Sequence, residues 1–80
     1  MNEDLIMFLI IDQLNKVTKT KVKYAIINDH VKCCINGKET GSFPLDEVTG
    51  IKIDFIDETV TVALGDKRLV RLTPLGVEWF

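Results

Sequence analysis

The sequence has few of the side chains on which catalysis and metal binding depend. Among 80 residues it holds one histidine, His30, and two cysteines, Cys33 and Cys34. A general base needs a nucleophile and an oxyanion donor within reach, and the sequence around His30 supplies neither. One histidine and two adjacent thiols also fall short of the four ligands of a structural zinc site. We therefore expect no catalytic residue, no metal site and no cofactor, and hence a protein that is not an enzyme.

A disulfide framework is missing as well. Adjacent residues of a strand point to opposite faces of a sheet, so Cys33 and Cys34 do not easily pair with each other. Secreted domains of this size usually carry several disulfides. The cysteine usage therefore indicates a reduced chain in the cytoplasm.

Long hydrophobic runs are absent too. The longest apolar run spans residues 5–11, whereas a membrane helix needs about 20 apolar residues. The acidic residues Glu3 and Asp4 precede this run, where a signal peptide would carry positive charge. We expect neither a signal peptide nor contact with a membrane, and we assign the run to a folded domain.

The composition is that of a small globular domain. The chain is 46% hydrophobic and 28% charged, which suits a soluble folded protein and argues against disorder. Its length leaves room for one domain, residues 1–80, with a core that buries roughly 60 to 65% of the surface exposed by the unfolded chain.

Residues 3–18 have the periodicity of an amphipathic helix. The predicted core face consists of Ile6, Met7, Ile10, Ile11, Leu14 and Val17. Leu5, Phe8 and Leu9 project from the opposite side of the helix. Because one layer of sheet cannot cover both sides, the first half of the helix has a second apolar side to bury.

Residues 20–73 change to the two-residue period of β-strands. A turn at Asn28-Asp29 gives a first hairpin. Its predicted partners are Ile26 and Val31, Tyr24 and Cys33, and Val22 and Ile35. The strongest turn signal of the chain covers residues 36–41. Residues 42–45 then form at most a short edge strand, because Pro44 cannot donate to a ladder.

A second hairpin follows, with Asp57-Glu58 as its predicted turn. The predicted partners are Phe55 and Val60, Ile53 and Val62, and Ile51 and Leu64. A last strand at 68–72 aligns its apolar residues with this hairpin only if the intervening loop has an odd number of residues or a bulge. Pro74 and Gly76 end that strand, which leaves residues 74–80 as a short tail.

These patterns predict an α+β fold in which an N-terminal helix is followed by a five- or six-stranded antiparallel meander. Such a sheet either curls into a small barrel of the SH3 or Sm type or stays open with the helix across one face. Strands of five to seven residues in a strict meander favour the curled form.

Charge gives one functional hypothesis. The net charge is −2, which argues against a general nucleic-acid binder. The first hairpin nevertheless places Lys21, Lys23 and Lys32 on one strand face, where they could bind phosphates. Aromatic side chains for stacking bases are missing there, since Tyr24 points to the other face. An Sm-like RNA-binding protein is therefore the alternative prediction.

The apolar surplus gives the leading hypothesis. Leu5, Phe8 and Leu9 on the helix and Trp79 and Phe80 at the end of the chain exceed what one small core can cover. Exposed apolar patches are typical of interfaces, and a homodimer would cover them. We expect a protein-binding adaptor or inhibitor, of the kind that phages and other mobile elements encode, acting on a protein partner, on a second copy of itself, or on both.

Overall fold

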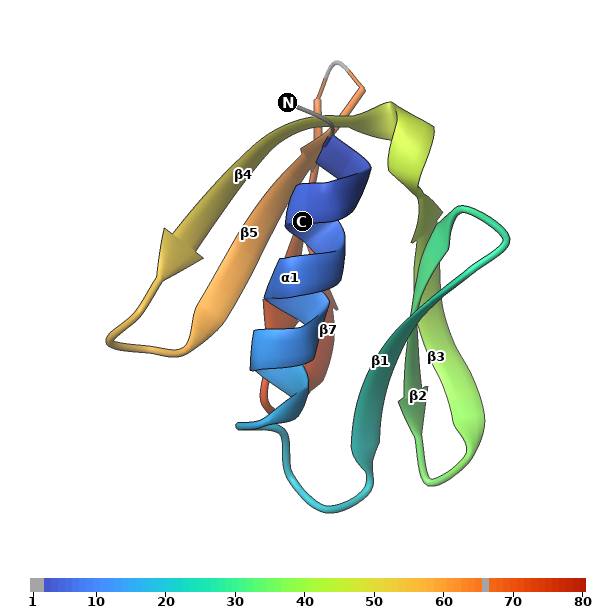
Figure 1. Cartoon of the computed structure of the whole chain (residues 1–80), viewed down its shortest axis with the longest axis vertical. Coiled ribbons are helices and arrows are strands. Elements are labelled where there is room, and N and C mark those ends of the chain that lie inside the picture. Colours follow the sequence, from blue (N-terminus) through green and yellow to red (C-terminus); the bar gives the residue numbers. More distant parts are fainter. Residues whose placement is uncertain (1–2, 66) are drawn as a thin grey trace.

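The computed structural model describes residues 3–65 and 67–80 and confirms the α+β class (Figure 1). Its elements in chain order are α1 (Glu3–Asn15), β1 (Val22–Ile27), β2 (His30–Ile35), β3 (Lys38–Pro44), the short 3-10 helix η1 (Leu45–Glu47), β4 (Val48–Asp54), β5 (Thr59–Leu64), β6 (Arg68–Thr73) and β7 (Gly76–Trp79). In these residues no helix is long and apolar enough to cross a bilayer.

The strands form two antiparallel sheets, β1-β2-β3 and β4-β5-β6-β7, in which spatial order follows chain order. The sheets meet where β7 lies beside β2 and β3. In Figure 1, α1 runs in front of the second sheet, with β1 at its side. No ladder joins the two sheets in the described part of the chain, so the strands do not close into a barrel. The inner faces of both sheets and one side of α1 share a single core.

The first sheet begins with the hairpin that the sequence predicts, in the predicted register. Asn28 and Asp29 both have positive φ, 52° and 60°, as a two-residue turn of type I′ requires. Asn36 and Gly37 repeat this arrangement with φ of 56° and 83°. Because that second turn takes only two residues, β3 begins at Lys38 and is longer than the short edge strand expected at 42–45.

The β4–β5 hairpin differs from its predicted register by two residues. Ile53 lies opposite Val60, and the predicted pair of Phe55 with Val60 is wrong. The loop takes four residues because the Asp54 carboxylate accepts hydrogen bonds from the backbone N–H groups of Ile56 and Asp57, at 3.0 Å each. A shift of two keeps every strand residue on its predicted face, but it moves Phe55 out of the sheet and leaves it 83% exposed.

The β5–β6 pairing aligns Val62 with Val70 across a loop at 65–67, which has the odd number of residues that the prediction required. Residue 66 of that loop lies outside the described part. The expected tail instead contains β7, which pairs with β6. The Thr73 hydroxyl makes this last turn, because it accepts the Leu75 N–H (3.0 Å) and donates to the Gly76 carbonyl (2.8 Å).

The helix ends at Asn15, three residues before its predicted end. The Asn15 side chain binds the backbone of Tyr24, donating to its carbonyl and accepting from its N–H, both at 2.8 Å. The amide thereby takes the place of a neighbouring strand at the edge of β1. Val17 consequently lies beyond the helix and is 36% exposed, so it does not join the predicted core face.

Candidate functional site

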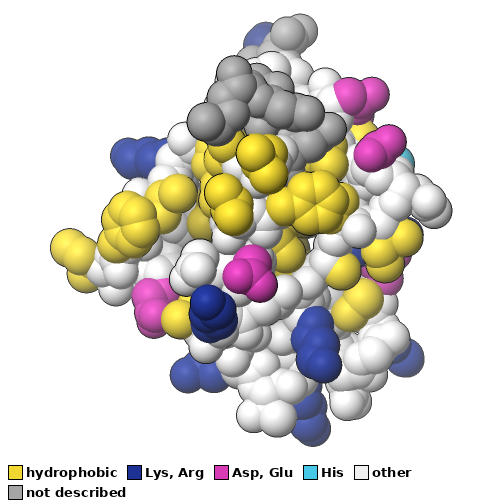
Figure 2. All heavy atoms as spheres, in the orientation of Figure 1, with side chains coloured by type: hydrophobic (Ala, Val, Ile, Leu, Met, Phe, Trp, Pro, Cys, Tyr) yellow, Lys and Arg dark blue, Asp and Glu magenta, His cyan; other side chains and the backbone are white. Residues whose placement is uncertain are grey.

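The outer helix face, which we define as Leu5, Phe8 and Leu9, lies at the surface as expected. These side chains are 54%, 53% and 61% exposed. Their spacing of three and four residues places them on one stripe of the helix. Figure 2 shows hydrophobic side chains gathered over the upper part of α1 and also at the tip of the β4–β5 hairpin, on the left of the view.

A groove between α1 and the β4–β5 hairpin adjoins this face. It consists of two hollows of about 320 Å³ each, which share Ile10 and Ile53. We call it the α1–β4 groove. Leu9 belongs both to its wall and to the outer helix face.

The groove runs along one side of α1 and just past its end, from Ile6 to Val17. Its helical part, from Ile6 to Leu14, spans eight steps of helical rise, which is roughly 12 Å or a little over two turns. Ile53 and Val60 lie opposite each other in the β4–β5 ladder, and both line the groove from its sheet side. Phe55, in the loop of the hairpin, lines one end.

Two acidic side chains, Asp54 and Glu58, line the end of the groove at the hairpin loop. Asp57 of the same loop lines a different hollow, together with Lys52 and Arg71. On the helix, Asp12 is largely exposed and lies 4.0 Å from Lys16. No lysine or arginine is among the described residues that line either hollow.

The structure places Trp79 and Phe80 on other elements than the outer helix face. Trp79 lies on β7, with its indole nitrogen 3.4 Å from the position that a Cβ at Gly41 of β3 would occupy. The Arg71 guanidinium lies 4.7 Å from the centre of the Phe80 ring, and it also pairs with Glu78 at 3.5 Å. No described contact joins these two aromatics to Leu5, Phe8 or Leu9.

The three lysines of the predicted nucleic-acid face lie on or beside the first hairpin. Lys23 and Lys32 are on β1 and β2, and Lys21 directly precedes β1. The Lys32 ammonium is 3.3 Å from the Glu39 carboxylate, so much of its charge is neutralised locally. Tyr24 is buried, as its predicted position requires.

The residues weighed for chemistry are separated. His30 Nδ1 lies 2.9 Å from the carbonyl oxygen of Asn28 within its own turn. Cys33 is buried, whereas Cys34 is half-buried on the opposite strand face. Among the residues that the structure describes, no three His, Cys, Asp or Glu side chains gather in a way that could hold a metal ion. Burial raises the pKa of the Tyr24 hydroxyl well above its ordinary value, and the electrostatic effect of the nearby Cys33 thiol raises it further.

Comparison with known proteins gives no match to a family model, to a curated protein or to a solved structure. Sequence reasoning found the outer helix face but missed the groove, because Phe55 and Val17 were assigned to the core. Asp54 was the sequence signal that Phe55 lies in a loop. An aspartate at the start of a loop often binds the backbone N–H groups two and three residues ahead.

Proposed function

We propose that this protein is a protein-binding module that acts by protein–protein contact and associates with itself through the outer helix face. The observation that carries the proposal is that Leu5, Phe8 and Leu9 are each more than half exposed on one stripe of α1. Apolar residues at this spacing are the anchors by which helices dock on protein surfaces.

A homodimer accounts for this stripe with one symmetric contact. In a twofold dimer the same patch serves both copies, so three large apolar side chains from each chain are covered together. Full burial of one such side chain is worth about 1.5 to 3 kcal/mol. Because each of the six side chains is already about half buried, dimerisation gains only about half of this free energy for each. The total is comparable with the association cost of roughly 4 to 15 kcal/mol, which favours reversible association.

The role of an adaptor or inhibitor follows from the small size and acidic charge of the chain. Cysteine usage supports a cytoplasmic location for this role. Phages and other mobile elements are the origin that we propose for a protein of this kind. Its target could be a different protein as well as a second copy.

Sedimentation of the wild type and of Phe8→Glu over a range of concentrations tests the proposal. We expect the wild type to change from monomer to dimer as its concentration rises, and Phe8→Glu to stay a folded monomer. Ile27→Glu is the matched control, because Ile27 is also half exposed but lies at the end of β1. It should dimerise like the wild type.

Each other outcome has a defined meaning. A wild type that remains monomeric at high micromolar concentration excludes self-association. A Phe8→Glu variant that unfolds would assign Phe8 to the core and contradict the exposed face. A wild-type monomer with a stably folded variant would leave a different protein as the partner.

RNA binding through Lys21, Lys23 and Lys32 is the second candidate. The position of Lys23 and Lys32 on neighbouring strands favours it. The ion pair between Lys32 and Glu39 weakens it, as does the inward position of Tyr24, so we rank it below protein binding.

A further inference from the structure

We propose that the α1–β4 groove is a second binding site, which adjoins the outer helix face and shares Leu9 with it, and that it receives a basic amphipathic helix of a partner protein. Three properties of the groove support this occupant: its shape, its charge and the fixed geometry of its end. Apart from Leu9, the residues that line the groove are not part of the outer helix face.

The shape fits one additional helix. Sheet faces are commonly covered by helices, which pack side by side with their axes 8 to 10 Å apart. In Figure 1, β4 lies to one side of α1, so the helix leaves that edge of the second sheet uncovered. The roughly 12 Å of α1 that lies along the groove offers contact to about two turns of a second helix.

The composition of the sheet wall favours a helix over an added strand. The sheet residues that line the groove include Ile53, whose side chain is 42% exposed, and its ladder partner Val60, which is buried. A strand that extended the sheet would bind the backbone edge of β4, outside this surface. An apolar helical face instead meets the exposed side chains of Leu9, Ile53 and Phe55.

Charge defines the other face of the occupant. Asp54 and Glu58 place two carboxylates at the hairpin-loop end of the groove, and no described lysine or arginine lines it. An acidic helix would be repelled there, whereas lysine or arginine beside the apolar face would be attracted. The partner is therefore a basic amphipathic helix.

The end of the groove is already ordered. The two hydrogen bonds from Ile56 and Asp57 to the Asp54 carboxylate hold the loop, and this loop carries Phe55 beside the groove. Because these bonds hold the loop backbone before binding, little backbone entropy of the loop is lost when a helix docks.

The test uses a synthetic peptide of about 14 residues, long enough for nearly four turns, with leucine on one face and lysine on the other. One control peptide replaces every lysine with glutamate. A second keeps the leucine and lysine content but scrambles the order, so that no apolar face forms. Binding is measured by titration, and the site is mapped by amide chemical shifts of the labelled protein.

Two pairs of variants locate the contact. Phe55→Ser changes the groove, and its control is Ile56→Ser, because Ile56 is the next residue and is 93% exposed but does not line the groove. Glu58→Lys changes the charge at the groove. Its control is Asp46→Lys, which changes the net charge by the same amount. Asp46 lies in η1, away from the hairpin loop (Figure 1).

We expect the amphipathic basic peptide to shift the amides of residues 6–17 and 53–60. Phe55→Ser should weaken it about tenfold or more, and Ile56→Ser by less than about twofold. Glu58→Lys should weaken it more than Asp46→Lys does. The acidic and scrambled peptides should bind at least about tenfold more weakly.

Several results would overturn the proposal. Equal loss with Phe55→Ser and Ile56→Ser, equal binding of the scrambled peptide, or amide shifts confined to another surface would each do so. Loss of dimerisation in Phe55→Ser would show that a second copy fills the groove. The dimer proposal is judged separately by Phe8→Glu, so either proposal can fail alone.

Discussion

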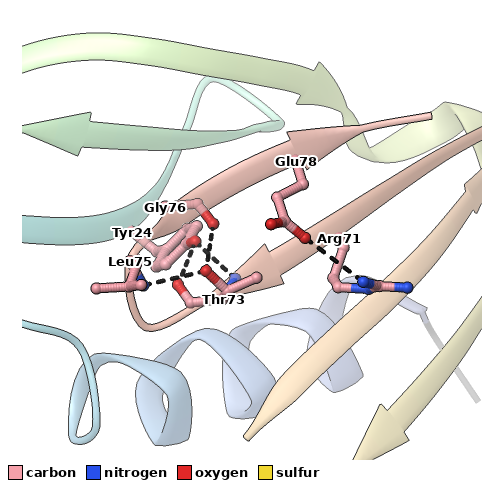
Figure 3. A network of polar contacts seen from close by, with 6 residues as sticks. All are labelled: Tyr24, Arg71, Thr73, Leu75, Gly76 and Glu78. Carbon is pink, nitrogen blue, oxygen red and sulfur yellow. Dashed lines mark hydrogen bonds and ion pairs between the residues drawn. The ribbon is translucent and has the colours of Figure 1, made fainter. Parts of the chain in front are cut away.

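The hydroxyl of Tyr24 on β1 donates a hydrogen bond to the carbonyl oxygen of Thr73 at the end of β6, and accepts one from the Thr73 N–H. The two bonds measure 2.7 Å and 3.0 Å. Figure 3 shows this pair beside the last turn of the chain. β1 and β6 belong to different sheets. The Tyr24 side chain therefore connects the two sheets by binding both the backbone N–H and the backbone carbonyl of Thr73.

Tyr24→Phe should therefore be costly for so small a change. It leaves the N–H and C=O of Thr73 without their partner, which typically costs about 1 to 3 kcal/mol when such groups are buried. For a domain of this size, each kcal/mol lowers the melting temperature by roughly 4 to 8 °C. Thermal unfolding followed by circular dichroism measures the shift. An unchanged melting temperature would mean that the tyrosine hydroxyl contributes nothing to the joint between the sheets.

The same hydroxyl predicts a loss of stability in alkali. Burial raises the pKa of Tyr24, so the folded protein holds this proton more tightly than the unfolded chain does. Its contribution is fully present below the unfolded pKa of about 10 and is lost as the pH rises above that value. The stability gap between wild type and Tyr24→Phe should thus stay constant up to about pH 9 and narrow above pH 10.

Since the chain has only one tyrosine, its tyrosinate absorbance reports this group alone. Ionisation should appear only above pH 10, together with unfolding. Ionisation of the folded protein near pH 10 would contradict the buried position.

Phe55 and Leu72 should differ sharply when each is changed to alanine. Leu72 is fully buried, and truncation of such a residue typically costs about 2 to 5 kcal/mol. Phe55 is largely exposed, so Phe55→Ala should change the free energy of unfolding by no more than about 0.5 kcal/mol. Urea denaturation of both variants provides the comparison. A large loss in Phe55→Ala would restore the register in which Phe55 faces Val60.

The two hairpins show how far the sequence alone could predict this fold. Between Ile27 and His30 the alternation of apolar residues and a two-residue turn agree, so one register is favoured. After Asp54 the strand pattern fits two registers equally well, because a shift of two preserves the faces. The choice is made by hydrogen bonds of the Asp54 side chain, which a count of apolar residues does not contain.

The groove could be predicted even less, because it depends on contacts between distant elements. The end of the helix is set by Asn15 binding the backbone of Tyr24, nine residues away. That contact removes Val17 from the helix. The uncovered edge at β4 depends on where α1 lies across the second sheet. The outer helix face, in contrast, follows directly from helical spacing and was predicted correctly as an exposed stripe.

We expect the lysine face, formed by Lys21, Lys23 and Lys32, to bind RNA only weakly. With Lys32 paired to Glu39, Lys21 and Lys23 can supply two phosphate contacts, for a slope of about −1.4 in log affinity against log salt on single strands. We expect mixed RNA oligonucleotides to bind no tighter than about 100 μM at physiological salt. Micromolar affinity would reverse our ranking of the two functions.

Changing all three lysines of this face to alanine should abolish whatever binding is found at low salt. The matched control changes Lys52 on β4, Lys67 in the loop before β6 and Arg68 on β6 to alanine, which alters the net charge equally. If both variants lose binding alike, the contact is non-specific and the first hairpin is not an RNA site.

Strand order that follows chain order has a consequence for how the molecule folds. Every ladder joins neighbours in sequence, so each hairpin closes a short loop, and the two sheets can form independently and rapidly. Their docking against each other then becomes the late step. The one tryptophan of the chain, Trp79, lies against Gly41 of the other sheet. Its fluorescence should therefore change after the circular dichroism of the strands during refolding, and so report the assembly of two preformed halves.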